Sequence, residues 1–132
     1  RSHYISTLDR HLNAARAYAI YHNQTVTICP HVALECTDSW RNDILIFVDD
    51  DNNRQRGGSE KILGTVTKPI AEDWVRYNRV SIAFGPTGML TGLSNGTFIY
   101  CSQKPELNEP AVRITISYVG RTRVRDVSKA CN

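Results

Sequence analysis

The sequence predicts an α+β domain in which one amphipathic helix packs on an antiparallel β-sheet. Two observations support this fold class: a helical period at the N-terminus, and a series of short β-rich runs that fills the rest of the chain. The 132 residues, of which 41% are hydrophobic and 22% charged, suffice for one globular domain with a buried core. We expect a single domain over residues 1–132, with the helix over 1–23 and a β-rich part over 24–132.

The helix is expected over residues 4–22, because apolar residues recur there at steps of three and four. No glycine or proline interrupts the run, and Asn23 follows it, where a helix often ends. The chain begins at Arg1, inside this pattern, so we expect a further segment upstream. The apolar stripe consists of Ile5, Leu8, Leu12, Ala15 and Ala19.

Seven short runs rich in β-branched and aromatic residues predict the strands. We expect Pro30 to end the first of them, because proline cannot donate to a β-ladder. The segment 69–77 predicts a turn or a single helical turn. The expected strands are 25–29, 44–48, 62–67, 79–84, 97–101, 112–117 and 121–127.

Four cysteines in a small domain predict two disulfides and an oxidising compartment. The sequence allows three pairings, and we prefer Cys29–Cys36 with Cys101–Cys131 because these are local and leave no cysteine over. The second bridge would contribute roughly 3–4 kcal/mol in the loop-entropy account. A zinc site is the alternative, but the chain has no C-x-x-C pair and its four histidines are scattered.

An acidic segment, residues 49–58, has the composition of a hairpin loop. It partly matches a calcium loop, but Arg54 stands at position six, where the tight turn requires glycine, and the flanks predict strands instead of helices. We therefore predict a solvated hairpin tip, no metal site and no cofactor. The residues at calcium-loop positions one, three, five and twelve are Asp49, Asp51, Asn53 and Glu60.

Positive charge is concentrated at the C-terminal end of the chain. Residues 111–132 hold five basic side chains and one acid, whereas the preceding 110 residues hold eleven basic and twelve acidic ones. This asymmetry indicates a polyanionic partner. Arg121, Arg123 and Arg125 alternate, so on a strand they would share one face at intervals of roughly 6–7 Å.

Five short motifs occur in order along the chain: AARAYAIYHNQTVTICP at 14–30, IFVDD at 46–50, FGPTG at 84–88, GTFIYC at 96–101 and GRTR at 120–123. Together they resemble motifs of bacterial minor type IV pilins of the FimT and FimU kind, which carry a GspH-like pseudopilin domain, and we judge the likeness closest to FimT. It covers nearly the whole chain and departs at Tyr18, where the family often has an acid.

The resemblance implies a pilin-like fold in which the helix is the distal part of a longer one. The missing part would be a transmembrane helix that anchors the subunit in the bacterial inner membrane and packs in the pilus core. The protein would then face the periplasm, join the extracellular pilus and have other pilin subunits as partners. We expect no enzymatic activity, since no nucleophile motif or recognisable pair of carboxylates stands out.

The C-terminal arginines predict sequence-independent, salt-sensitive binding to the phosphates of DNA. Within the family, the FimT type is associated with DNA binding in natural transformation. Its closing G-R-x-R is carried over to Arg121 and Arg123, whereas charge alone adds Arg125 and Lys129. The aromatic residues that could stack on bases are Trp74, Tyr100 and Tyr118.

Other interpretations of these arginines stay open. Alternating charge can protect an edge strand from aggregation. A structural minor pilin, or a type II secretion pseudopilin that primes filament assembly, would use the arginines against neighbouring subunits and bind no DNA. A surface adhesin would use them for other acidic polymers, and an unrelated secreted module is a further alternative. The sequence does not distinguish single-stranded from double-stranded DNA.

Overall fold

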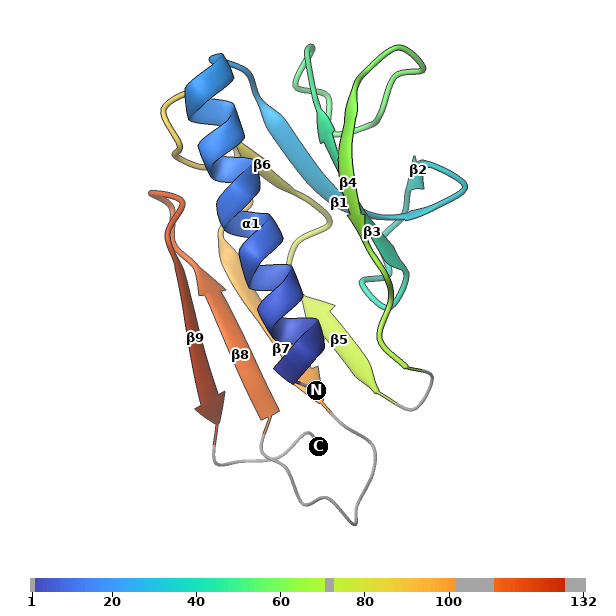
Figure 1. The fold of residues 1–132 in the computed structure, drawn as a ribbon, viewed down its shortest axis with the longest axis vertical. Coiled ribbons are helices and arrows are strands. Elements are labelled where there is room, and N and C mark those ends of the chain that lie inside the picture. Colours follow the sequence, from blue (N-terminus) through green and yellow to red (C-terminus); the bar gives the residue numbers. More distant parts are fainter. Residues whose placement is uncertain (1, 71–72, 102–110, 128–132) are drawn as a thin grey trace.

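The computed structural model describes residues 2–70, 73–101 and 111–127, and one long helix dominates the view in Figure 1. Helix α1 spans Ser2–His22. Asn23 follows it with a backbone φ of 54°, the left-handed geometry that is common just after a helix. Among the described residues, no helix is both long and apolar enough to cross a membrane. The predicted apolar stripe is confirmed, because all of its residues are buried: Ile5, Leu8, Leu12, Ala15 and Ala19.

The first sheet, as far as the structure describes it, has five strands with antiparallel neighbours. Its order is β2-β1-β3-β4, and β6 also pairs with β1. The register places Ile28 of β1 opposite Ile46 of β3, so the core residues of the two central strands share one face. The strand bounds are β1 Val26–Val32, β2 Glu35–Cys36, β3 Asp43–Val48, β4 Ile62–Val66 and β6 Ile82–Phe84.

The second sheet has four described strands in the order β5-β7-β8-β9, again with antiparallel neighbours. Strands β5 and β9 are its edges. The register aligns Phe98, Ile114 and Val124 across β7, β8 and β9. The strand bounds are β5 Trp74–Tyr77, β7 Gly96–Cys101, β8 Ala111–Ile116 and β9 Thr122–Val127.

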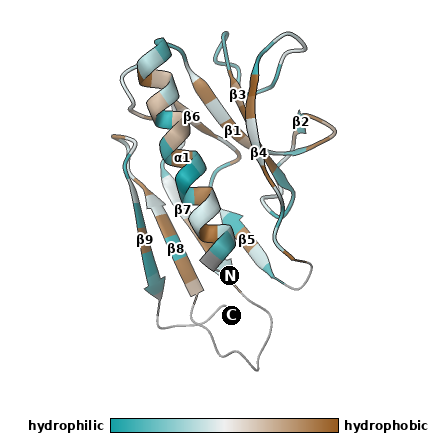
Figure 2. Ribbon diagram, viewed as in Figure 1, coloured by the Kyte–Doolittle hydropathy of each residue, from teal (hydrophilic) through white to brown (hydrophobic). Residues whose placement is uncertain are grey.

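Helix α1 packs against both sheets, contacting β1, β4 and β6 of the first and β8 and β9 of the second (Figure 1). Figure 2 shows both hydrophobic and hydrophilic residues along the helix and along most of the strands. Aromatic rings join the layers: Tyr4 of the helix stacks on Tyr100 of β7 at 5.4 Å, and Trp40 lies edge-on to Phe98 at 5.1 Å. The core is therefore one contiguous layer between the helix and the inner faces of both sheets.

The predicted α+β class, with a helix on antiparallel β-structure, is confirmed, but the strands are divided between two sheets instead of one. The predicted turn at 69–77 is wrong at its end, where residues 74–77 form strand β5. Val75 and Tyr77 are buried while Arg76 between them is exposed. This alternation over only four residues is too short to stand out in the sequence.

The prediction that Pro30 ends the first strand is wrong. Strand β1 continues through Pro30 to Val32. Strand β6 pairs with β1 only as far as Ile28, and β2 begins its pairing at His31. Pro30 lies in the gap between these two partners, with its carbonyl oxygen accepting from Thr37 N at 2.7 Å. Its missing N–H faces the same gap, where no strand needs a donor.

The disulfide Cys29–Cys36 is present, as predicted. It joins β1 to β2 on the side of the first sheet away from the helix, where Cys29 packs with Leu45 and Phe47 in a small separate cluster. Cys101 is buried on the second sheet. Its predicted partner Cys131 lies outside the described residues, so the second disulfide stays a prediction.

Candidate nucleic-acid interface

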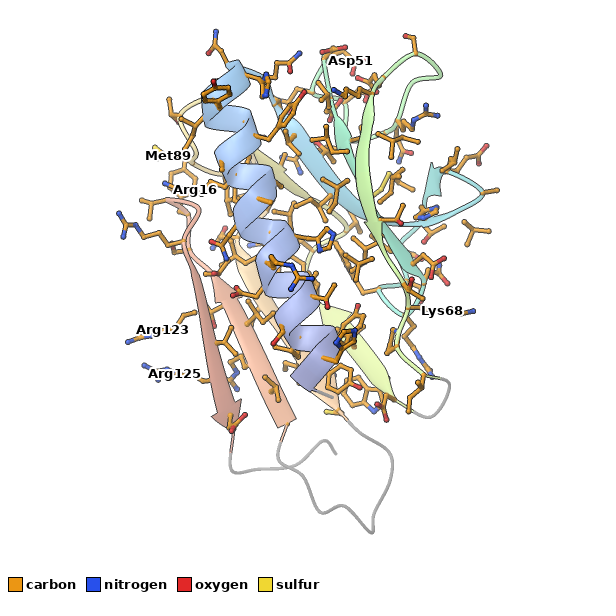
Figure 3. All side chains as sticks on the ribbon, viewed as in Figure 1. Arg16, Asp51, Lys68, Met89, Arg123 and Arg125 are labelled. Carbon is orange, nitrogen blue, oxygen red and sulfur yellow. A yellow bond between two sulfur atoms is a disulfide. The ribbon has the colours of Figure 1, made fainter. Side chains whose placement is uncertain are left out.

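The C-terminal arginines lie on β9, an edge strand of the second sheet. Thr122 faces the helix, since Asn13 Nδ2 donates a hydrogen bond to its Oγ1 at 3.2 Å. Side chains alternate along a strand, so Arg123 and Arg125 lie on the opposite face. Both are exposed and point away from the body of the protein in Figure 3. The structure thus brings these two predicted site residues together on one open surface.

Arg121 lies immediately before β9 and continues the same row. Ser117 N donates to Arg121 O at 3.0 Å, and Arg121 N donates to Ser117 Oγ at 3.3 Å. The first of these bonds extends the β8–β9 ladder by one step, and the Arg121 side chain is exposed. The three arginines therefore follow one face at two-residue intervals, roughly 6–7 Å apart along the strand.

Two further arginines share this surface, and sequence reasoning did not assign them to the site. The register places Arg125 opposite Arg113 of β8, Arg113 opposite Ile99 of β7, and Ile99 opposite Arg76 of β5. The alternation of β8, with buried residues on both sides of Arg113, is a signal that could have identified it. The alignment of Arg76 with this row needs the register. We call this surface the outer face and define it by Arg76, Arg113, Arg121, Arg123 and Arg125.

The outer face carries no compensating negative charge among the described strand positions that share it. Asp126, the acid nearest in sequence, opposes Val112 and so lies on the other face of the sheet. None of the five arginines forms an ion pair with another described residue. A guanidinium group is permanently charged and can donate two hydrogen bonds to the oxygens of one phosphate. This surface can therefore bind a chain of phosphates.

The three aromatic residues considered for base stacking have different environments. Tyr100 is buried in the core, where its Oη donates to an Asp73 carboxylate oxygen. Trp74 is half-buried on β5, with the Arg76 guanidinium 5.3 Å from its ring centre. Tyr118 is 56% exposed in the turn before Arg121. Of the three, Trp74 therefore lies on the outer face beside Arg76, and Tyr118 is exposed in the turn between β8 and β9. The predicted site residue Lys129 lies outside the described residues.

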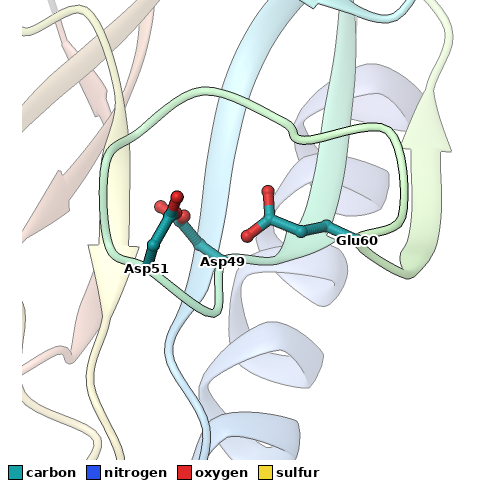
Figure 4. A group of neighbouring side chains, drawn as sticks. All are labelled: Asp49, Asp51 and Glu60. Atoms are coloured by element: carbon teal, nitrogen blue, oxygen red, sulfur yellow. The ribbon is translucent and has the colours of Figure 1, made fainter.

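The acidic segment lies in the loop between β3 and β4, and Figure 4 shows the carboxylates of Asp49, Asp51 and Glu60 close together. Asp49 is fully buried and accepts from Thr27 Oγ1 at 2.7 Å and from Arg54 N at 2.9 Å. Glu60 accepts from Asp50 N at 2.7 Å and Gly57 N at 2.6 Å. Both carboxylates accept from the backbone of their own loop, and Asp49 also accepts from a side chain of β1.

Arg54 ties this loop to the rest of the fold. Its guanidinium donates to Ser81 Oγ at 3.0 Å and to Thr91 Oγ1 at 3.2 Å, both outside the loop. Burial lowers the pKa of Arg54, and the nearby negative charge of Asp49 opposes that shift. Arg54 also has a φ of 65°, the left-handed conformation that glycine supplies in a calcium loop.

The family model described as type II transport protein GspH matches residues 5–120. No curated protein sequence matches the chain. The fold is similar to that of the type IV minor pilin FimU from Pseudomonas aeruginosa PAO1, with a TM-score of 0.73 and 19% identity over 99% of this chain and 97% of that one. A second FimU structure from the same strain gives a TM-score of 0.69 and 18% identity, covering 98% of this chain and 91% of that chain.

The minor pseudopilin EpsH of the type 2 secretion system of Vibrio cholerae is also similar, with a TM-score of 0.63 and 13% identity over 92% of each chain. At these identities the solved structures establish the fold, while the family match covers most of the chain. The predicted resemblance to FimU-like minor pilins is confirmed, whereas a closer likeness to FimT stays a prediction. The chain belongs to the family of the type II transport protein GspH, and it has the fold of the minor pilin FimU and the minor pseudopilin EpsH.

Proposed function

We propose that this chain is a minor type IV pilin of the FimT kind that binds DNA, independently of sequence, for uptake in natural transformation. The residues proposed to bind the phosphates are Arg121, Arg123, Arg125 and Lys129. The observation that supports this most is the exposed row of arginines on an edge strand, without acidic partners among the described residues. Nothing in that row indicates reading of base edges, so in this proposal the phosphates supply the affinity.

The proposal includes the cellular setting that the family implies. The full-length subunit has an upstream transmembrane helix, sits in the inner membrane facing the periplasm, and enters the pilus beside other pilin subunits. An oxidising periplasm suits the disulfide Cys29–Cys36 and the proposed bridge Cys101–Cys131. Cys101 lies opposite Trp74, on the same side of the second sheet as the arginines, so this bridge would tie the C-terminal end to that side.

The second candidate is a structural minor pilin or type II secretion pseudopilin that primes filament assembly and binds no DNA. The family description and the likeness to EpsH favour it. In that case the arginines contact acidic surfaces of neighbouring subunits. The two candidates differ in whether the isolated domain binds DNA.

The deciding experiment is a fluorescence anisotropy titration of this domain with a 30-base-pair duplex at several NaCl concentrations. The test variant is Arg121→Gln/Arg123→Gln. The matched control is Arg10→Gln/Lys68→Gln, which removes the same charge from two exposed positions outside the outer face. We expect a log–log salt slope of about −2 or steeper for the wild-type chain, as two or more phosphate contacts require.

The arginine variant should lose most of its affinity, whereas the control should stay close to wild type. Absence of binding at 20 mM NaCl, or equal affinity in both variants, would exclude the arginines as the site and leave the structural role. Binding to heparin as tight as to DNA would indicate an adhesin for acidic polymers in general.

A further inference from the structure

Arg113 and Arg125 face each other directly across β8 and β9, with no strand position between them. Residues opposed in this way have Cβ atoms about 4.5–5.5 Å apart, and like charges there destabilise the sheet. Neither guanidinium has an ion-pair partner among the described residues. The chain therefore keeps a repulsive pair on an exposed surface where a neutral residue would be more stable.

Protection of sheet edges does not account for this pair. Charged residues on β9 and β5 can guard the two edges of the second sheet, which explains Arg125 and Arg76. Arg113 lies on β8, an interior strand that already has partners on both sides. A bound polyanion does account for it, because phosphates placed between two guanidinium groups turn their repulsion into attraction.

The row that contains this pair crosses the sheet at right angles to the predicted row on β9. It leads from Arg125 through Arg113 and Ile99 to Arg76, a span of roughly 14 Å at about 4.8 Å per strand. The Arg76 guanidinium lies over the ring of Trp74, which limits its freedom and keeps it at the surface. The two rows meet at Arg125 and make the basic surface two-dimensional.

We infer that Arg113 and Arg76 are DNA-binding residues, so that the phosphate backbone is held across the whole outer face and not only along the C-terminal strand. This inference rests on the proposed function, since it takes DNA as the ligand. It identifies residues that the closing G-R-x-R motif does not contain. It also implies that DNA stabilises the fold by relieving the repulsion between Arg113 and Arg125.

The wild-type chain provides the first test. Six phosphate contacts, the four of the proposed function together with Arg76 and Arg113, predict a log–log salt slope of about −5.4 on duplex DNA, whereas the four alone predict about −3.6. The second test is the variant Arg76→Gln/Arg113→Gln, for which we expect a slope shallower by about 1.8 and an affinity lower by roughly 10–100-fold near 100 mM NaCl. The control is again Arg10→Gln/Lys68→Gln.

Thermal unfolding separates binding from a structural role of Arg113. The variant Arg113→Gln should unfold at the same or a higher temperature than wild type without DNA, because the repulsion is gone. An added 30-base-pair duplex should also raise the unfolding temperature of this variant by less than it raises that of wild type. A lower unfolding temperature of Arg113→Gln without DNA, together with unchanged affinity, would overturn the inference.

The outcomes distinguish this inference from the proposed function. If Arg121→Gln/Arg123→Gln loses binding while Arg76→Gln/Arg113→Gln keeps the wild-type affinity and slope, the proposed function stands and the inference is wrong. If both variants lose affinity and the control does not, both stand. If the wild-type chain binds no DNA at 20 mM NaCl, both are wrong.

Discussion

Asp49 is a fully buried carboxyl group at the base of the β3–β4 loop. Burial raises its pKa above the ordinary value of 3.8, although hydrogen bonds from Thr27 and Arg54 oppose the shift. The folded chain therefore holds this proton to a higher pH than the unfolded chain does. Consequently its contribution to the free energy of unfolding falls as pH rises from below 3.8 through the folded-state pKa.

This direction can be tested with Asp49→Asn, which keeps an acceptor oxygen but has no proton to lose. The unfolding free energy of the variant minus that of wild type should increase as pH rises from about 3 to about 7. Urea denaturation at several pH values measures the difference. The control is Asp50→Asn, an exposed neighbour in the same loop. A difference that is constant, or that decreases with pH, would contradict the raised pKa.

Gly120 has a structural reason within the GRTR motif. Its φ is 90°, and a Cβ built there would lie 2.0 Å from Gly88 O and 2.9 Å from Arg16 Nε. Arg16 Nε itself donates to Gly88 O at 3.0 Å, so this turn abuts a contact between the helix and the turn after β6. The glycine of the motif thus allows this turn to pack closely against Gly88, while the arginines of the motif are on the surface.

We expect Gly120→Ala to lower the free energy of unfolding by roughly 2 kcal/mol or more, because both the backbone and the space exclude a side chain. Gly58→Ala is the matched control, since a Cβ there meets no atom within 4 Å. Urea denaturation of both variants measures the cost. Equal stability of the two would contradict the close approach of Gly120 and Gly88.

At the scale of elements, the β1–β2 hairpin carries an unusual turn. Val32 pairs with Glu35, so Ala33 and Leu34 form a two-residue loop. Their φ values are 52° and 68°, both left-handed. Such a loop favours Asn-Gly, because most other residues pay a steric cost in this conformation. The hairpin is held by the neighbouring Cys29–Cys36 disulfide in spite of this strain.

Leu34→Gly should therefore raise the free energy of unfolding by about 1 kcal/mol, since it relieves the left-handed strain and removes a side chain that is already 41% exposed. Leu93→Gly is the control: Leu93 is 77% exposed, and its φ is not among the positive ones. Chemical denaturation should show stabilisation for the first variant only. Destabilisation by Leu34→Gly would mean that its side-chain contacts outweigh the strain.

Most elements could be predicted from the sequence because their signals are local. The helix shows its period over several turns, and β3, β7 and β8 are bounded apolar or alternating runs. The sequence did not predict strand β5, because its alternating pattern rests on only two buried residues, Val75 and Tyr77. The predicted end of β1 at Pro30 was wrong because a strand can contain a proline where no partner needs its N–H. Here that depends on where β6 and β2 end, which no local pattern shows.

At the scale of the whole molecule, pairing partners decide what the sequence cannot show. The division into two sheets depends on β6 joining β1 and on β5 joining β7, each across a long stretch of chain. The candidate site follows the same rule. Alternation on β9 predicted that Arg123 and Arg125 share a face, but only the register brings Arg113 and Arg76 beside them.

The acidic loop shows the same limit from another side. In the sequence, Arg54 reads as a departure from a calcium loop. In the fold it donates hydrogen bonds to Ser81 and Thr91, which lie far along the chain, and so fastens the loop to residues on both sides of β6. A residue that seems misplaced within its own segment can serve contacts that only the tertiary structure creates.

Helix α1 and the outer face lie on opposite sides of the second sheet. Substitutions on one side therefore leave the chemistry of the other unchanged, as long as the buried positions between them are kept. Natural selection can act on the two surfaces separately: a lineage can gain or lose arginines on the outer face while it conserves the helix. Comparison of related genomes should accordingly find more variation in the charge of the outer face than in the apolar stripe of the helix.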